Sequence, residues 1–320
     1  VDEESIILAA QISEVLNIQH NSLESVKLTK NKYLMRKELE KSCLSPWFRI
    51  FSVYKSQEAN YSEIKYPCVI KPTFLSGSQG VIRANNKSEF IKNVKIIKKL
   101  LSRDEVIKKG GDKAKWFLVE EFIPGREISI EGIVNDGNLK ELAIFDKPDT
   151  LNGPTFPETI LITPTTLKKE IQIKIIGTAK IALKTLGIVK GPVHIEIRIN
   201  KKGIYIIECA ARSIGGLCSK ALEFDGDMSL EELIIRSSLG RNINKTKLKG
   251  LIKGVMMMPI EKQGVLREIR GAKSALSLSG ITELKMTVKR GEMLETLPLG
   301  DRYLGFIFAE AKDHKSIIKK

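Results

Sequence analysis

The 320-residue sequence is poor in the residues that build metal centres and disulfide frameworks. Its four cysteines, Cys43, Cys68, Cys209 and Cys218, have no metal-ligand spacing, and only three histidines accompany them. Four scattered cysteines in a chain of this length indicate reduced thiols that pack in the interior, as is typical of a cytoplasmic protein. A structural zinc site or a disulfide framework is therefore not expected.

Long apolar runs are absent as well. No stretch of about 18 uncharged apolar residues occurs that would span a bilayer. The start, Val1-Asp2-Glu3, has neither the basic part nor the apolar part of a signal peptide. Because 42% of the residues are hydrophobic and 28% are charged, we expect one large or two smaller globular domains without a membrane partner.

Acidic residues are also in short supply, since 38 Asp and Glu accompany 53 Lys and Arg, for a net charge of +15. Clustered cations bind nucleic acids by releasing counterions from phosphate. Here the lysines are spread over the chain, for example in 90–99 and 167–184, without an RRM, KH or zinc-finger pattern. A lysine-rich surface that attracts small anionic substrates is the preferred interpretation, and no nucleic-acid partner is expected.

Hydrophobic periodicity predicts an α+β protein. The predicted helices are Asp2–Asn17, Thr29–Ser42, Asn86–Leu101 and Leu167–Leu186. The predicted strands are Trp47–Tyr54, Tyr66–Lys71, Trp116–Glu121, Arg126–Val134, Leu139–Phe145, Val193–Ile199 and Gly203–Glu208. Because consecutive strands follow one another through short turns, antiparallel hairpins are expected rather than regular βαβ units.

The loop after Lys71 has the composition of a phosphate-binding turn. Small residues at 76–80 let backbone N–H groups approach phosphate oxygens, and Lys71 supplies a matching charge. The Gly-Lys-Ser/Thr of a Walker loop is absent, and plain turns favour the same small residues. On these residues alone, a plain turn is the better interpretation.

Two glutamates lie on the two arms of one predicted hairpin. Alternation along the first arm places His194, Glu196 and Arg198 on one face, and Glu208 ends the second arm. Carboxylates on adjacent strands repel unless a cation lies between them, and hard oxygen ligands suit Mg²⁺ held together with substrate phosphates. An exposed sheet face with salt bridges explains this pair equally well.

Arg212 follows in a loop of small residues, where it can contact phosphoryl oxygens or a substrate carboxylate. A lone arginine in a loop is usually a surface residue. Together with Lys71, the small loop and the two glutamates, however, it completes what phosphoryl transfer needs: donors for phosphate, a metal, and charge to balance the transition state.

These stretches resemble the ATP-grasp superfamily over nearly the whole chain. The motifs, in family order, are Tyr66-Pro-Cys-Val-Ile-Lys71-Pro, Ser76-Gly-Ser-Gln-Gly80-Val, Val119-Glu-Glu-Phe-Ile-Pro-Gly-Arg-Glu127, Gly191-Pro-Val-His-Ile-Glu196 and Ile207-Glu208-Cys-Ala-Ala-Arg212. Residues 254–259 and 303–308 are similar to the terminal domain of amino-acid-ligase-like members. The resemblance implies an ATP-grasp fold, in which two lobes with antiparallel sheets sandwich ATP, followed by a small C-terminal α+β domain.

The same resemblance implies a domain organisation. We expect a helical segment with a linker in 1–65, the small lobe in 66–125, the large lobe with the metal site in 126–245, and a C-terminal ligase-like domain in 251–320. The family also has a small domain before this region. Val1-Asp2-Glu3 resembles the exit from that domain, so the sequence is expected to lack it.

Carried over residue by residue, the resemblance implies ATP and Mg²⁺ as cofactors. Phosphate contacts are expected from Lys32, Lys71 and a lid that contains Ser76, Gly77, Ser78 and Gly80. Adenine and ribose contacts are expected from Glu120 and Glu121 at the hinge, from the backbone N–H of Ile123, and from Glu127. His194 stands where many relatives have an arginine beside the nucleotide.

Glu196 and Glu208 are the implied Mg²⁺ ligands, and Lys71 and Arg212 are the implied catalytic residues. One departure concerns the metal site, because many members have an asparagine where this chain has Ala210. Either the second Mg²⁺ is held less fully, or a water replaces the amide.

The activity implied is that of an ATP-dependent carboxylate–amine ligase, which joins a small-molecule carboxylate and an amine through an acyl phosphate and releases ADP and phosphate. A homodimer is left open. The alternatives are a carboxylase-like enzyme that uses bicarbonate and a nucleotide-binding regulator, the latter suggested by Ala210. The irregular segment Asp146–Glu158 is expected to line the acceptor pocket, with Lys147 and Glu158 as the residues that set substrate preference.

Overall fold

The computed structural model describes residues 5–54 and 58–319, so the predicted helix start at Asp2 and the stretch Val1-Asp2-Glu3 lie outside them. The described chain begins with helices α1 (Ser5–Val15), α2 (Leu23–Thr29) and α3 (Lys32–Leu39). The single helix predicted over Thr29–Ser42 is wrong, because the side chain of Asn31 caps a separate helix by accepting hydrogen bonds from two backbone N–H groups of its first turn. This cap places Lys32 at the start of α3.

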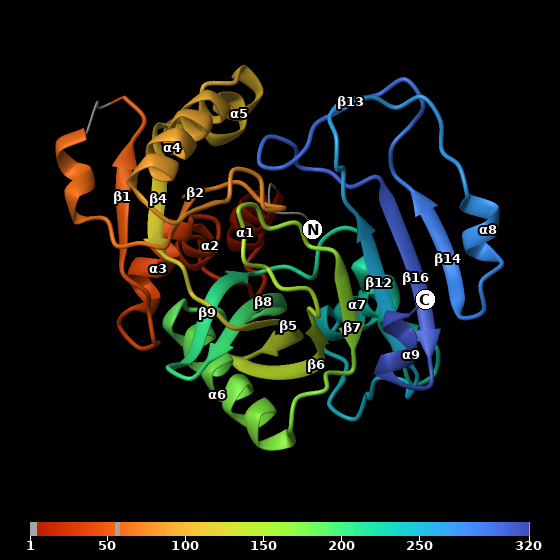
Figure 1. The fold of residues 1–320 in the computed structure, drawn as a ribbon. Helices are drawn as coiled ribbons and strands as arrows, with labels where there is room; N and C mark the ends of the chain where they lie inside the picture. Colours follow the sequence, from red (N-terminus) through yellow and green to blue (C-terminus); the bar gives the residue numbers. More distant parts are fainter. Residues whose placement is uncertain (1–4, 55–57, 320) are drawn as a thin grey trace.

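The first lobe is a four-stranded antiparallel sheet in the order β1-β4-β2-β3. Its strands are β1 (Phe48–Ser52), β2 (Cys68–Pro72), β3 (Ile82–Ala84) and β4 (Trp116–Glu121). Around it lie η1 (Glu58–Glu63), α4 (Lys87–Leu101), α5 (Asp104–Gly110) and η2 (Gly111–Lys115). Helix α4 packs on β2 and β3, as its apolar stripe of Phe90, Val94, Ile97 and Leu101 requires (Figure 1).

The second sheet has eight antiparallel strands in the order β14-β16-β12-β7-β6-β5-β8-β9. Its strands are β5 (Arg126–Asn135), β6 (Asn138–Asp146), β7 (Ile160–Thr163), β8 (Gly191–Asn200), β9 (Gly203–Ala210), β12 (Ile252–Met258), β14 (Ile281–Met286) and β16 (Gly305–Ala311). The helices beside it are α6 (Lys169–Thr185) and α7 (Leu230–Ser238). The short elements are η3 (Cys218–Ala221), β10 (Glu223–Phe224), β11 (Met228–Ser229), β13 (Gly264–Val265), α8 (Ala272–Leu276), β15 (Met293–Leu294) and α9 (His314–Ile318).

The α+β class and the antiparallel hairpins predicted from periodicity are confirmed. The domain boundaries stay predictions, and two pairings cross them. Strand β1 lies within 1–65 yet forms one edge of the first sheet, and β12, from 251–320, pairs with β7 of the large lobe. Within the described residues, every helix is too short or too polar to span a bilayer.

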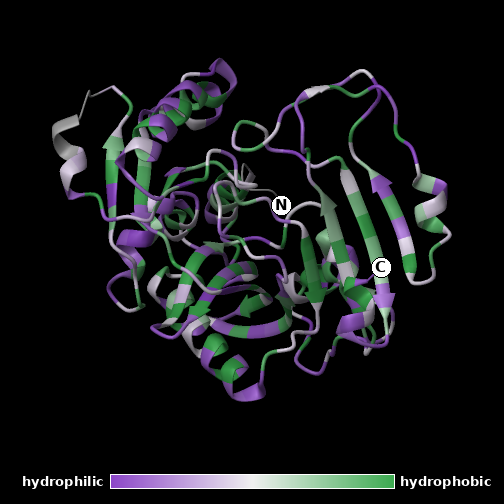
Figure 2. Cartoon of the chain, in the orientation of Figure 1, coloured by the Kyte–Doolittle hydropathy of each residue, from purple (hydrophilic) through white to green (hydrophobic). Residues whose placement is uncertain are grey.

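Hydrophobic and hydrophilic residues alternate along strands of the large sheet (Figure 2), and successive side chains of a strand point to opposite faces. On β5, Ile128 and Ile130 are fully buried in the core under α6. Glu127, Ser129 and Glu131 occupy the alternate positions of the same strand. The sheet therefore has an apolar face against α6 and a face rich in charged groups opposite it.

Candidate active site

A cavity of about 470 Å³ lies between the first lobe, the charged face of β5, β8 and β9, and the loop before β16. The predicted residues that line it are Lys32, Lys71, Ser76, Gly77, Ser78, Glu120, Glu121, Ile123, Glu127, His194, Glu196, Glu208 and Arg212. Among the residues predicted to contact nucleotide or metal or to act in catalysis, only Gly80 does not line it. Of the two residues predicted to set substrate preference, Glu158 lines it and Lys147 does not. The structure therefore brings together motifs that are separated by up to 180 positions, from Lys32 to Arg212.

Lys32 connects three elements at this cavity: helix α3, strand β9 and the segment before the small-residue loop. From the start of α3, its Nζ lies 2.9 Å from Glu208 Oε2 on β9 and donates at 2.9 Å to the backbone carbonyl of Leu75, just before the small-residue loop. The side chain is only 10% exposed, so this ion pair is largely shielded from water. A cation thus lies between the second predicted metal ligand and the predicted phosphate loop.

A second, buried cluster consists of Lys71, Glu120 and Arg36. The Glu120 carboxylate pairs with Lys71 through one oxygen, and its other oxygen lies 3.3 Å from Arg36 Nε. Burial raises the pKa of Glu120, but Lys71 and Arg36 outweigh it and hold that pKa below its usual value. Burial lowers the pKa of Lys71, and Glu120 opposes this in part. The Glu120 carboxylate, expected to face adenine, is thus directed at two cations.

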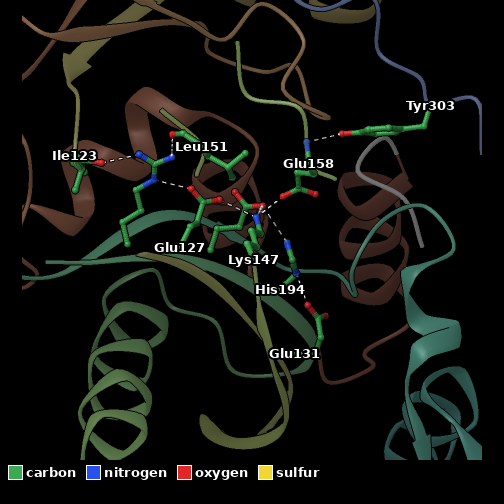
Figure 3. A network of polar contacts seen from close by, with 10 residues as sticks. Ile123, Glu127, Glu131, Lys147, Leu151, Glu158, His194 and Tyr303 are labelled. Atoms are coloured by element: carbon green, nitrogen blue, oxygen red, sulfur yellow. Dashed lines mark hydrogen bonds and ion pairs between the residues drawn. The ribbon is translucent and has the colours of Figure 1, made fainter. Parts of the chain in front are cut away.

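Lys147 is the centre of a third cluster (Figure 3). Its Nζ lies 2.8 Å from Glu127 Oε1 and 2.9 Å from Glu196 Oε1, and it also pairs with Glu158. Burial lowers the pKa of Lys147, but the three carboxylates outweigh it and raise that pKa well above its usual value. Burial raises the pKa of Glu158 to about 7. Lys147 was predicted only as part of a substrate loop, and its position among Glu127 and Glu196 was missed.

A further cation, Arg198, borders the same carboxylates. Arg198 Nε lies 2.6 Å from Glu127 Oε2, and its guanidinium also donates to the carbonyls of Ile123 (2.7 Å) and Leu151 (2.6 Å). This arginine therefore ties the predicted hinge to β8 and to the loop after β6. The prediction that His194, Glu196 and Arg198 share one face of β8 agrees with these contacts.

His194 is held by Glu131, a residue that the motifs did not identify. The two side chains form an ion pair, and Glu131 also accepts a hydrogen bond from the backbone N–H of Ile214 at 3.0 Å. Burial lowers the pKa of His194, but Glu131 outweighs it and raises that pKa to about 10. Because Ile214 follows Arg212 closely, Glu131 also anchors the loop that carries Arg212, whose Nη1 donates to the carbonyl of Ser213 at 2.8 Å.

The carboxylates provide a donor set that suits a hard divalent cation. Oxygens of Glu127, Glu158 and Glu196 lie within 4.8 Å of one another, and Glu196 is directly opposite Glu208 in the β8–β9 register. The predicted pairing of Glu196 with Glu208 across one hairpin is therefore confirmed. Ala210, opposite His194 on the same strand pair, contributes no ligand oxygen.

An apolar slot lies beside the charged groups. It is made by Val69, Phe122 and Phe156, with Val81 and Leu151 at its edge. The rings of Phe122 and Phe156 are stacked with their centroids 6.4 Å apart. The Cζ atom of Arg198, which lines the cavity, lies 5.2 Å from the Phe122 ring centroid, so positive charge borders this apolar part. A flat, apolar slot beside cationic side chains suits a purine base.

The small-residue loop is attached to the C-terminal region. Gly80 N donates to the carbonyl of Pro298 at 2.8 Å, and Gln79 Nε2 donates to that of Leu299 at 2.8 Å. Gly77 and Gly80 have φ values of 62° and 75°, a region that glycine adopts without strain, and Ser78 between them has a φ of 59°, which is uncommon for a residue with a side chain. Hydrogen bonds to these two main-chain carbonyls therefore hold the loop at the cavity, and the motif itself did not predict them.

The sequence contains weak signals that could have identified the site residues missed by the motifs. Arg36 lies four positions after Lys32 on the buried face of α3, where a charged residue without a partner would be costly. Glu131 lies at the same period-two spacing as Glu127 along β5. Tyr303 was part of a recognised stretch, but its hydroxyl accepts from the Glu158 backbone N–H at 3.1 Å, which only the packing of the C-terminal region produces.

Comparison with known proteins agrees with this geometry. A family model for the ATP-grasp domain matches residues 64–221, and one for the L-amino acid ligase C-terminal domain 2 matches residues 256–320. The solved structure of the L-amino acid ligase from Bacillus licheniformis superposes with a TM-score of 0.81 at 25% identity, covering 98% of this chain and 76% of that one. The two-lobed fold expected from the motifs is confirmed.

Two curated ligases are similar in sequence. Alanine–anticapsin ligase of Bacillus subtilis strain 168 is 28% identical over 221 residues, which cover 64% of this chain and 46% of that protein. D-alanine–D-alanine ligase of Pelagibacter ubique is 26% identical over 218 residues, which cover 64% of this chain and 65% of that protein. The chain thus spans about half the length of the first of these relatives.

Proposed function

The chain belongs to the ATP-grasp family, and from this premise we propose that it acts as an ATP-dependent carboxylate–amine ligase. The reaction forms an amide bond through an acyl phosphate and releases ADP and phosphate. The observation that carries the proposal is the convergence of Lys32, Lys71, Glu196, Glu208 and Arg212 on one cavity. Cations and hard-metal ligands around a single cavity are what a bound polyphosphate requires.

The nucleotide is proposed to lie with its base in the apolar slot of Phe122 and Phe156 and its phosphates toward Lys32 and Lys71. The backbone N–H of Ile123 and the Glu121 backbone are next to this slot and suit the edge of an adenine. Glu127 has the position expected for a ribose contact, although Lys147 and Arg198 already hold its carboxylate. The loop 76–80 covers the phosphates and excludes water.

Glu196 and Glu208 are the proposed Mg²⁺ ligands, with Glu127 and Glu158 close enough to assist. The metal supplies charge neutralisation for the phosphates when it is bound. Lys32 now pairs with Glu208, and Lys147 with Glu196, so each proposed ligand carboxylate has a cationic partner within the protein. Burial raises the pKa of Glu196, but Lys147 and His194 outweigh it and hold that pKa well below its usual value, so this carboxylate is ionised.

Chemistry begins when the substrate carboxylate oxygen attacks the γ-phosphorus of ATP and the bond to ADP breaks. Lys71 and Arg212 balance the negative charge that develops on the phosphoryl oxygens. The nitrogen of the amine then attacks the acyl carbon, phosphate leaves with the electron pair of the broken C–O bond, and the amine loses a proton. The enzyme forms no covalent bond to either substrate.

Loop Asp146–Glu158 is the proposed wall of the substrate pocket, because Leu151, Phe156 and Glu158 line the cavity and Lys147 is buried behind them. Arg302 and Tyr303 also line the cavity, and the Tyr303 hydroxyl accepts a hydrogen bond from the Glu158 backbone N–H at 3.1 Å. Charged groups of both signs next to apolar rings suit small zwitterionic or polar acids and amines.

The test is ADP release from the full-length protein with a panel of carboxylic acids and amines, followed by detection of the amide. Release should require Mg²⁺ together with an acid. Glu208→Gln is expected to lower turnover about 100-fold, or roughly 2.7 kcal/mol, without changing the unfolding temperature. Glu283→Gln, which removes a surface partner of Lys220, is the matched control and should keep full activity.

Near-normal turnover of Glu208→Gln would contradict the metal assignment. A nucleotide-binding regulator is the second candidate, favoured by Ala210, which supplies no ligand oxygen at a place where family members have an amide. ATP binding without acid-dependent ADP release across the whole panel would favour the regulator over the ligase.

A further inference from the structure

The buried ammonium group of Lys147 occupies the middle of a carboxylate cluster. Its Nζ donates to Glu127 at 2.8 Å, to Glu196 at 2.9 Å and to Glu158. An ammonium has three N–H donors, and here each of the three carboxylates accepts one of them. The Lys147 side chain is 3% exposed, so water does not supply an alternative partner.

The same three carboxylates form the set that suits a metal ion, with oxygens within 4.8 Å of one another. We propose that Lys147 is a positioning residue that holds the place of a divalent cation, keeping these carboxylates together while preventing the cation from binding before a nucleotide arrives. This inference rests on the proposed function in taking Glu196 as a metal ligand and in taking a nucleotide as the ligand that brings the metal.

The physical reason is electrostatic. Three carboxylates this close repel strongly in a buried site unless a cation lies among them. Lys147 is that cation, and Arg198 and His194 border the group at 2.6 Å from Glu127 and 3.6 Å from Glu196. A divalent cation that enters alone meets an ammonium in the middle of its ligands. A cation that enters with a nucleotide brings the negative charge of the phosphates, which offsets this repulsion.

The geometry also explains why the residue is a lysine. Its compact ammonium places one positive charge at the point where the carboxylate oxygens converge, as a metal ion would. Lys147 follows β6 directly, and Asp146 before it is anchored by the backbone N–H of Thr166 at 2.7 Å and by the hydroxyl of Thr165 at 2.5 Å. The lysine therefore extends from a fixed backbone position rather than from a free surface loop.

The experiment replaces Lys147 with Met, which keeps most of the volume and removes the charge. Binding of Mn²⁺ to the full chain without nucleotide is measured by electron paramagnetic resonance. The wild type is expected to bind Mn²⁺ weakly, and Lys147→Met to bind it at least about tenfold more tightly, because the three carboxylates then face the ion without an ammonium in their centre. Lys147→Arg, which keeps a cation in place, and Lys220→Met, which removes a surface lysine, should resemble the wild type.

A folded Lys147→Met protein with wild-type Mn²⁺ affinity would overturn the proposal, as would Lys147→Arg gaining the same affinity as Lys147→Met. If the Met variant is unstable, Mn²⁺ should restore its cooperative unfolding and raise its Tm far more than that of the wild type. Failure of Mn²⁺ to do so also contradicts the proposal. The measurement uses no substrate, so it is independent of ligase activity. Absence of acid-dependent ADP release in the wild type would reject the proposed function and leave the Mn²⁺ result standing.

Discussion

The ion pair between Arg103 and Glu295 connects the first lobe to the segment that forms hydrogen bonds with the small-residue loop 76–80. Arg103 Nη1 and Nη2 lie 2.8 Å and 2.9 Å from the two carboxylate oxygens of Glu295, a bidentate arrangement. The residues just after Glu295 include Pro298 and Leu299, whose carbonyls accept from Gly80 and Gln79. We expect this pair to stabilise the closed position of loop 76–80, so that its loss weakens ATP binding.

The expected free energy of this ion pair follows from the solvent exposure of its two side chains. The side chains of Arg103 and Glu295 are 22% and 41% exposed, so solvent screens the pair and its worth is about 0.5–1 kcal/mol despite the bidentate geometry. If that free energy favours the closed loop, Arg103→Ala or Glu295→Ala raises the KM for ATP about two- to fivefold. The KM of the acceptor amine should change less, and the effect should fade at high salt.

The assay is steady-state ADP release as a function of ATP concentration, run on both single variants, on the double variant and on the charge exchange Arg103→Glu/Glu295→Arg. The effects of the single variants should not add in the double variant, because both remove the same interaction. The charge exchange should restore part of the affinity. Strictly additive effects, or an unchanged KM in both single variants, would refute the idea that this pair holds the loop closed.

Two further predictions concern stability. Arg36→Met should lower the free energy of unfolding by about 3–5 kcal/mol, measured by urea denaturation, because it removes a buried partner of Glu120; a loss under about 1 kcal/mol contradicts this. Hydrogen bonds from Lys249 and Lys253 lower the pKa of Glu223 to about 2, so the stability it contributes is present above its usual pKa and is lost as pH falls from about 4.5 toward 2. The Tm of Glu223→Gln should therefore lie below that of the wild type at pH about 6 and approach it near pH about 2; an equal difference at both values rejects the assignment.

Local patterns explain why much of the fold was predictable. Period-two alternation predicted β5, β6, β8 and β9, and the short turns between them left antiparallel pairing as the natural outcome. The position of Glu196 opposite Glu208 does not follow from alternation alone. The register set by the short turn would place Ile207 opposite Glu196, and a one-residue register shift between Glu196 and Ile197 brings Glu208 there instead. Helix bounds were less predictable near Asn31, where the side-chain cap starts α3 at Lys32 rather than at Thr29 and separates it from α2, a helix that was not predicted.

The sequence by itself determined the fold class and the family, because these depend on periodicity and on motifs, and it predicted many of the residues that line the cavity. Only the tertiary structure decided which charges pair. Lys71 pairs with Glu120 across 49 positions, and Lys147 with Glu196 across the same separation. Such pairs depend on how the lobes and the loop after β6 pack, and no local spacing encodes that packing. In a buried site, each cation is held by the nearest carboxylate that the fold brings within reach, and unpaired charges are too costly to remain.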